Sequence, residues 1–180
     1  MKRLCVFCGS HTGTRPDFRK EARNLGQAMV RRGLGLVFGA GHIGLMGVLA
    51  DAVLEAGGQA IGVIPQSMVD RELAHTGLSE LRIVQTMHQR KALMADLADA
   101  FAALPGGFGT ADELFEILTW AQLGMHHKPI GLLNVAGFFD PLLAWLDRTV
   151  EEGLVRSVHR RLLRAAASAE ELLDRLGLTA

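Results

Sequence analysis

Short apolar runs alternate with amphipathic stretches along this chain, and this alternation restricts the fold more than any other feature. Strands are predicted over residues 4–8, 34–38, 60–64, 81–84, 100–104, 130–133 and 162–166. Amphipathic helices are predicted over residues 17–32, 44–56, 87–97, 111–123, 141–151 and 169–176. Strands that alternate with helices favour a parallel sheet with helices on both faces. We therefore expect an α/β fold with a parallel sheet of about seven strands.

The size and charge of the chain narrow its class. Its 180 residues, of which 49% are hydrophobic and 21% charged, suit one globular domain. Nineteen Lys and Arg residues balance nineteen Asp and Glu residues, so no net charge attracts nucleic acid or anionic lipid. The apolar run after Met1-Lys2-Arg3 is too short for a secretory signal, and no stretch reaches a membrane-spanning length. We expect a cytoplasmic protein without a nucleic-acid or membrane partner.

Cys5 and Cys8 form a C-x-x-C pair, a spacing that elsewhere indicates zinc binding or thiol redox chemistry. Both lie in the predicted strand 4–8, where residues three apart point to opposite faces. No second cysteine pair is present, and the seven histidines show no ligand spacing. We therefore expect two reduced, buried thiols and no metal site.

Three of the predicted strands end in glycine-bearing turns, which occupy residues 8–10, 39–44 and 105–113. The carboxyl ends of parallel strands meet at one edge of a sheet, where ligands of α/β proteins bind. The turns therefore predict a crevice for a phosphorylated small molecule. Gly9, Ser10 and Gly41 are secondary candidates for contact with it.

The turn at residues 39–44 reads G-x-G-x-x-G, a pattern typical of dinucleotide-binding oxidoreductases. It follows the second strand instead of the first, and no acidic residue follows the next strand to hold a ribose. Glycines that let a helix pack closely on the sheet are the favoured interpretation. A nicotinamide-dependent dehydrogenase is the alternative.

Residues 105–113, PGGFGTADE, join a strand to a helix through three glycines. Glycines leave main-chain N–H groups uncovered and a helix start is partially positive, so the turn predicts a phosphate cradle. Glu113 follows one turn into the helix. Thr110 and Glu113 also match a capping box, and the spacing alone favours this structural role for Glu113. Glu116 lies nearly on the same helical face and either lines the site with Glu113 or faces water.

Residues 87–94, MHQRKALM, place Arg90 and Lys91 near the start of a helix, where the helix dipole disfavours positive charge. A bound anion would explain this placement, because arginine offers a planar fork and lysine a mobile point charge. Solvated surface charges are the alternative. Arg71 and Glu72 form a further charged pair in the long irregular stretch 65–79, where a salt bridge and a functional role remain open.

The two long motifs resemble those of the Lonely Guy (LOG) family, whose described activity is that of a cytokinin riboside 5′-monophosphate phosphoribohydrolase. Residues 105–113 match its pattern P-G-G-x-G-T-x-x-E, and residues 87–94 match M-H-x-R-K-x-x-M. Shorter similar patterns lie at residues 6–10, 44–47, 62–65 and 118–124. One departure from the family pattern is Ala40, where a glycine is commoner.

The resemblance implies a single Rossmann-like catalytic domain over residues 1–180, a homodimer, and no metal or nicotinamide cofactor. It implies that Arg90 and Glu113 are the catalytic pair. The residues that it implies for substrate binding are Glu72, Arg90, Lys91, Gly106, Gly107, Phe108, Gly109, Thr110, Ala111, Asp112, Glu113 and Thr119. Some members carry an older label of lysine decarboxylase, but this sequence shows no evident pyridoxal site.

The hypothesis that follows is hydrolysis of the N-glycosidic bond of adenosine 5′-monophosphate (AMP) or its N6-prenylated relative, which releases the base and ribose 5-phosphate. The 5′-phosphate would dock on the N–H groups of residues 106–110, with the ribose beside Glu113. Arg90 would keep Glu113 ionised, or stabilise the departing base or a phosphate oxygen. Thr119 lies about 120° around the helix from Glu113, so we expect a site shared across a dimer.

A non-catalytic protein is the alternative to this enzyme. A relative of the same fold carries the molybdenum cofactor, so the chain could bind a nucleotide or that cofactor without turnover. Release of free base from AMP would distinguish the two.

Overall fold

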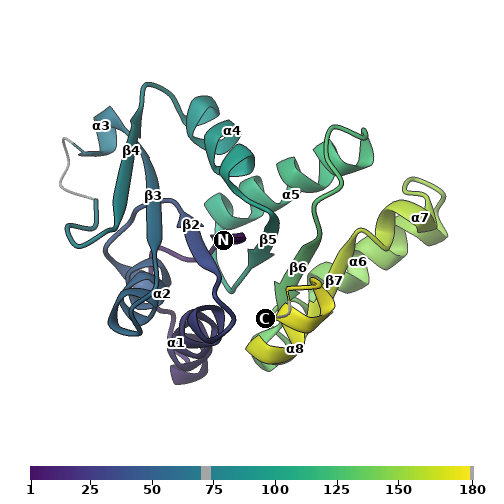
Figure 1. Ribbon diagram of the computed structural model, residues 1–180. Coiled ribbons are helices and arrows are strands. Elements are labelled where there is room, and N and C mark those ends of the chain that lie inside the picture. Colours follow the sequence, from purple (N-terminus) through teal and green to yellow (C-terminus); the bar gives the residue numbers. More distant parts are fainter. Residues whose placement is uncertain (70–73, 179–180) are drawn as a thin grey trace.

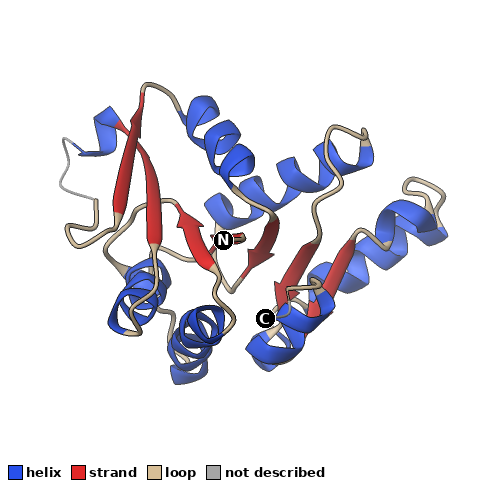
Figure 2. Ribbon diagram, in the orientation of Figure 1, coloured by secondary structure: helices blue, strands red, loops and turns tan. Residues whose placement is uncertain are grey.

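The computed structural model describes residues 1–69 and 74–178 and contains one sheet of seven strands. The strands are β1 (Arg3–Phe7), β2 (Gly35–Phe38), β3 (Ala60–Pro65), β4 (Glu80–Val84), β5 (Ala100–Ala103), β6 (Ile130–Leu133) and β7 (Leu163–Ala166). All neighbouring strands are parallel, in the order β4-β3-β2-β1-β5-β6-β7. Figure 2 shows strands in red and the surrounding helices in blue. The predicted α/β fold with a seven-stranded parallel sheet is confirmed.

Helices cover both faces of the sheet (Figure 1). The longer helices are α1 (Pro16–Arg31), α2 (Gly44–Glu55), α4 (Met87–Leu97), α5 (Phe108–Gln122), α6 (Asp140–Glu151) and α8 (Ala169–Arg175). Short α3 (Gln66–Val69), η1 (Val135–Gly137) and α7 (Ser157–Arg160) lie in connections for which no helix was predicted. One core cluster joins the sheet to α1, α2 and α8, and the other joins it to α4, α5 and α6.

Strand β1 shows how the two cores share the sheet. Leu4 and Val6 belong to the core under α1 and α2, whereas Cys5 and Phe7 belong to the core under α4 and α5. Cys8, just after the strand, falls in the first core, so both thiols are buried, free and directed to opposite faces. Within residues 1–69 and 74–178, no group of three potential metal-ligating side chains occurs. No helix of that part is long and apolar enough to span a bilayer.

The start of α5 differs from the prediction. The helix begins at Phe108 instead of residue 111, and its N-cap is Gly107, which makes no side-chain capping bond. Thr110 therefore lies inside the first turn, and the capping box predicted for Thr110 and Glu113 is wrong. Because the chain enters the helix through glycine, Glu113 has no capping role and its carboxyl group is available for other contacts.

The strand order places a topological switch point in the middle of the sheet. From β1 the chain proceeds outward through β2, β3 and β4, and then returns to add β5 on the other side of β1. The turns after β1 and β5 leave their strands in different directions, which opens a crevice at the carboxyl ends of the two strands. The predicted glycine-bearing turns thus meet at one edge.

Ala40, the departure from the LOG pattern, has a φ of 61°, in the left-handed region that favours glycine. It is fully buried and lies two residues after the end of β2. The chain therefore keeps the backbone shape of a glycine turn while accepting the strain of one methyl group, about 1 kcal/mol.

Gly26 fixes the contact between α1 and α2. A Cβ atom built on Gly26 would lie 2.9 Å from the Ala52 Cβ and 3.0 Å from the Leu49 carbonyl oxygen. We expect Gly26→Val to lower the free energy of unfolding by about 2 kcal/mol, because the added atoms would force the two helices apart. Urea unfolding monitored by circular dichroism measures the change. Lys20→Val, at an exposed position of α1, is the matched control and should cost about 0.5 kcal/mol; equal losses would contradict this account of the packing.

Candidate active site

The N-terminus of α5 carries uncovered hydrogen-bond donors. Ala111 N donates to Gly107 O and closes the first turn, which leaves the N–H groups of Phe108, Gly109 and Thr110 without an intrahelical acceptor. A Cβ atom built on Gly107 or Gly109 would meet nothing within 4 Å. These glycines therefore leave open space in front of the donors, as an anion site at a helix N-terminus requires.

Main-chain bonds at Gly9 join the three glycine-bearing turns. Gly9 N donates to Pro105 O at 3.1 Å, and Gly9 O accepts a bond from Leu45 N at 2.9 Å. The turn after β1 is thereby fixed to the turn after β5 and to the first residues of α2. A Cβ atom on Gly44 would overlap the main chain of Ser10, which supports the packing interpretation of the G-x-G-x-x-G pattern.

Glu113 lies one helical turn beyond the donors, and its side chain is only 13% exposed. Burial raises the pKa of Glu113 to about 7, because desolvation disfavours the charged carboxylate. Arg90 and Lys91 act in the opposite direction, while Asp112 and Glu116 add to the increase. Glu113 therefore changes its charge near neutral pH, as a group that handles protons in catalysis must.

Arg90 is buried and held by main-chain carbonyl groups. Its Nε donates to Val63 O and its Nη2 donates to Gly39 O, both at 3.2 Å. The same Nη2 lies 3.9 Å from Glu113 Oε1, within ion-pair range but too far for a direct hydrogen bond. The ends of β2 and β3 thus hold a fixed positive charge opposite the carboxyl group of Glu113.

A cavity of about 430 Å³ brings the predicted parts of the site together. Gly9, Ser10, Gly41, Arg90, Gly107, Phe108, Gly109, Thr110 and Glu113 line it. Its remaining wall contains four apolar side chains, Ile43, Met46, Ile64 and Met68, which sequence reasoning did not assign to the site. They come from separate segments, so no local pattern identifies them. Ile43 and Met46 lie at the start of α2, Ile64 lies at the end of β3 and Met68 lies in α3, and these positions after the strands were the available signal.

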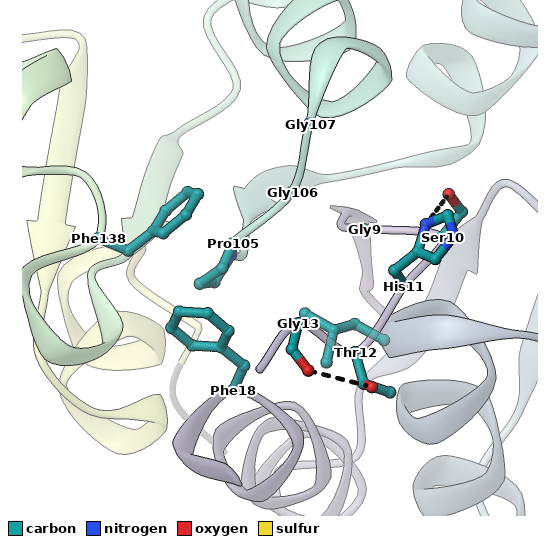
Figure 3. Close-up of a pocket in the computed structure, with 11 residues that line it drawn as sticks. Gly9, Ser10, His11, Thr12, Gly13, Phe18, Pro105, Gly106, Gly107 and Phe138 are labelled. Carbon is teal, nitrogen blue, oxygen red and sulfur yellow. Dashed lines mark hydrogen bonds between the residues drawn. The ribbon is translucent and has the colours of Figure 1, made fainter. Parts of the chain in front are cut away.

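A second hollow of about 310 Å³ borders the Gly106–Gly107 turn (Figure 3). Phe18 and Phe138 close one side, with ring centroids 5.5 Å apart in an edge-to-face arrangement. On the opposite side, Ser10 Oγ lies 3.3 Å from His11 Nδ1. The two hollows share Gly9, Ser10 and Gly107, so both border the turns after β1 and β5.

Lys91 does not line the cavity. Its Nζ lies 3.0 Å from Asp112 Oδ2 and 3.1 Å from Glu116 Oε2. Burial opposes its charge, but hydrogen bonds to the two carboxylates outweigh that effect and raise the pKa of Lys91. Lys91 therefore links α4 to α5, and Glu116 is directed to Lys91 instead of lining the cavity beside Glu113.

Thr119 lies on the outer side of α5, where its Oγ1 donates to Phe115 O at 2.7 Å. It lines a separate, open hollow of about 450 Å³ with Ala111, Asp112, Phe115, Glu116 and Trp120. The structure therefore does not bring Thr119, Ala111 or Asp112 into the cavity that contains Glu113. Glu72 falls outside the described residues.

Replacement of Glu113 should change the pH dependence of stability. Between pH 4.5 and about 7, folded protein keeps a proton that the unfolded chain has released, so the stability of the wild type falls as pH rises. We expect Glu113→Gln to exceed the wild type by about 3 kcal/mol at pH 8 and to match it near pH 4. Urea unfolding across this range measures the difference. Glu152→Gln, whose side chain is 52% exposed, is the control, and an equal gain there would contradict the burial of Glu113.

Solved structures share the fold of the chain. The X-ray structure of TM1055 matches it with a TM-score of 0.69 and 26% identity, covering 97% of both chains. The molybdenum cofactor binding protein from the phototrophic bacterium Rippkaea orientalis matches with a TM-score of 0.73 over 97% of this chain and 94% of its own. Its identity of 21% supports a shared fold alone.

The family of the chain is shown by its sequence relatives. The family described as "Possible lysine decarboxylase" matches residues 46–176. The cytokinin riboside 5′-monophosphate phosphoribohydrolase LOG of Oryza sativa subsp. japonica is 50% identical over 97% of this chain and 72% of its own length. LOG7 of Arabidopsis thaliana, with the same described activity, is 48% identical over 97% of this chain and 81% of its own. This chain belongs to the LOG family of cytokinin riboside 5′-monophosphate phosphoribohydrolases, within that larger family.

Proposed function

We propose that this protein hydrolyses the N-glycosidic bond of a cytokinin riboside 5′-monophosphate, an N6-prenylated adenosine 5′-monophosphate, and releases the base and ribose 5-phosphate. One observation carries the proposal: the uncapped start of α5, the buried Glu113 and the buried Arg90 border a single cavity. Relatives with this activity that are about half identical to the chain support the same reaction. We assign it to one catalytic domain over residues 1–180, in the cytoplasm.

The 5′-phosphate docks on the N–H groups of Phe108, Gly109 and Thr110. The open space in front of Gly107 and Gly109 accommodates its oxygens, and the helix dipole favours their negative charge. Because the phosphate is fixed one turn before Glu113, the ribose is held beside the carboxyl group. Positioning of this kind lowers the barrier by removing motions before the reaction.

Glu113 acts on the bond between ribose and base. Cleavage of a glycosidic bond develops positive charge on the sugar, and a nearby carboxylate stabilises that charge and orients the attacking water. Water adds to C1′ as the C1′–N bond breaks and its electron pair leaves with the base. The proton that the water loses is taken up by the departing base. The positive charge of Arg90 favours the ionised form of Glu113.

The apolar wall of the cavity suits the base of the substrate. Ile43, Met46, Ile64 and Met68 border the same cavity as Glu113, and methionine side chains adapt readily to planar or branched ligands. A prenylated adenine would bury more apolar surface there than adenine itself. This wall supports the prenylated nucleotide as the preferred substrate.

Two other activities fit the cavity less well. A pyridoxal-dependent lysine decarboxylase needs a lysine to form the Schiff base, and the described residues that line the cavity with Glu113 include no lysine. A molybdenum-cofactor carrier is supported only by the shared fold. It would not require an acid whose pKa is raised to about 7 opposite a fixed arginine.

Catalysis should depend on the ionised form of Glu113. We expect Glu113→Gln to lower kcat for isopentenyladenosine 5′-monophosphate by about 10³-fold while calorimetry shows nearly unchanged binding. In the wild type, kcat/KM should fall as pH drops below about 7, since protonation removes the carboxylate. Chromatography of the released base measures both. A fully active Glu113→Gln variant would refute the mechanism.

The substrate is decided by a separate measurement, which compares the wild-type rates of base release from AMP and from the prenylated nucleotide.

We further propose that the enzyme is a homodimer in which Thr119 serves the site of the partner. Thr119 lies in a hollow outside the Glu113 cavity of its own chain. Exposed apolar side chains accompany it on the surface of α5 and α6, including Leu123 at 67% and Trp145 at 54% exposure. Apolar surface of this kind is typical of an interface.

Disruption of this surface should separate the subunits and reduce activity. We expect Thr119→Arg to give monomers, because a buried unpaired charge opposes association, with kcat/KM lowered at least about tenfold. Analytical ultracentrifugation and the rate of base release report the two effects. Thr14→Arg, in an exposed loop, is the control. A wild-type monomer that keeps full activity on dilution would defeat the shared site.

A further inference from the structure

Gly39 has no side chain, and the guanidinium of Arg90 occupies the space that a side chain would fill. A Cβ atom built on Gly39 would overlap Arg90 Nη2 and would lie 3.0 Å from Cζ and 3.5 Å from Nε. The φ angle of Gly39 is not among the positive values of the chain. Glycine is therefore required at this position for space and not for backbone conformation.

The end of β2 and the neighbouring β3 together form a slot for the guanidinium. Gly39 O accepts from Nη2 and Val63 O accepts from Nε. Nη1 lies 3.7 Å from Met87 Sδ on the first turn of α4. The two hydrogen bonds to carbonyl groups offset part of the cost of burying this cation. Together with the Met87 contact they hold the guanidinium from three directions.

The orientation of Arg90 matters because its Nη2 also faces Glu113, at 3.9 Å from Oε1. Among the residues that the structure describes, Lys91 of α4 is the other positive group that acts on Glu113, and it is paired with Asp112 and Glu116 of α5. Cys5 in β1 and Cys8 just after it also interact electrostatically with Glu113, but burial raises the pKa of both thiols and keeps them protonated. Arg90 is thus the main positive charge available to the carboxylate.

We propose that Gly39 is a positioning residue whose missing side chain creates the slot that holds the Arg90 guanidinium against Glu113. Gly39 borders the cavity, but its effect on the reaction is exerted through Arg90. A methyl group at this position displaces Nη2, weakens the charge opposite Glu113 and makes the carboxyl group harder to ionise. The role in catalysis rests on the proposed hydrolase function, whereas the effect on Glu113 does not.

The test therefore measures the ionisation of Glu113 through protein stability, without relying on activity. Free energies of unfolding are measured from pH 4 to pH 9 for wild type, Glu113→Gln, Gly39→Ala and the Gly39→Ala/Glu113→Gln double variant. The difference within each pair reports the ionisation of Glu113. In each pair, the Glu113→Gln protein becomes more stable than its parent as pH rises, and this difference in the free energy of unfolding reaches a constant value at a pH that we call the levelling pH. We expect the levelling pH to be about one unit higher in the Gly39→Ala pair than in the wild-type pair. An unchanged levelling pH overturns the proposal.

Gly35→Ala is the matched control, since it adds the same methyl group at the start of β2, the strand that Gly39 follows. The nearest atom to a Cβ at Gly35 is the terminal methyl of Met1 at 3.2 Å, which moves easily, so this variant should leave the levelling pH unchanged. Arg90→Met is the positive control and should move it in the same direction as Gly39→Ala. Failure of Arg90→Met to move it would overturn the link between Arg90 and Glu113.

The rate of base release adds a second readout. The acid limb of the kcat/KM profile should shift upward in Gly39→Ala by the same amount as the levelling pH. If wild type releases no base, the proposed hydrolase function fails, while the unfolding measurements still decide the role of Gly39. If Gly39→Ala does not fold, Gly39→Ala/Arg90→Ala should fold again because the clashing atoms are gone, and an unfolded double variant overturns the proposal.

Discussion

The hydrogen bonds made by the main chain of Gly9 determine how the rest of the site is arranged. Gly9 follows β1, the central strand, and bonds to Pro105 after β5 and to Leu45 at the start of α2. These contacts align the start of α5 with the cavity wall that follows β2 and β3. The described part of the site is thus built largely from main-chain turns, and within it Arg90 and Glu113 contribute charges that face each other.

Those two charges lie where water is largely excluded, and this has opposite effects on stability and chemistry. Burial of Glu113 costs folding free energy at neutral pH, since the carboxyl group resists ionisation. The same burial strengthens the interaction of the carboxylate with a developing positive charge on a sugar. The chain balances nineteen basic against nineteen acidic residues. The electrostatic field that acts on a bound substrate therefore comes from the charges that line the cavity.

The sheet was predictable because parallel strands are buried on both faces and so appear as short continuous apolar runs. The two motifs also predicted Arg90, Glu113 and the phosphate turn together. The helix start was misplaced because Thr110 and Glu113 match a capping box, a pattern that ignores the glycine entry to α5. Lys91 follows Arg90 directly, but neighbours on a helix point about 100° apart, so only Arg90 reaches the cavity. The apolar wall was missed because its residues come from separate segments and form no local motif.

The place of β1 in the sheet also affects how the chain acquires its structure. One edge of β1 pairs with β2, which is near in sequence, through Arg3 with Gly35 and Leu4 with Leu36. Its other edge pairs with the distant β5, where Leu4 lies opposite Ala100. During synthesis the first strand can meet β2 early, but it stays open along its other edge until β5 has left the ribosome. Pairings between such distant segments are formed slowly, and exposed strand edges invite association with other chains. The nascent protein thus passes through a stage in which its central strand is vulnerable.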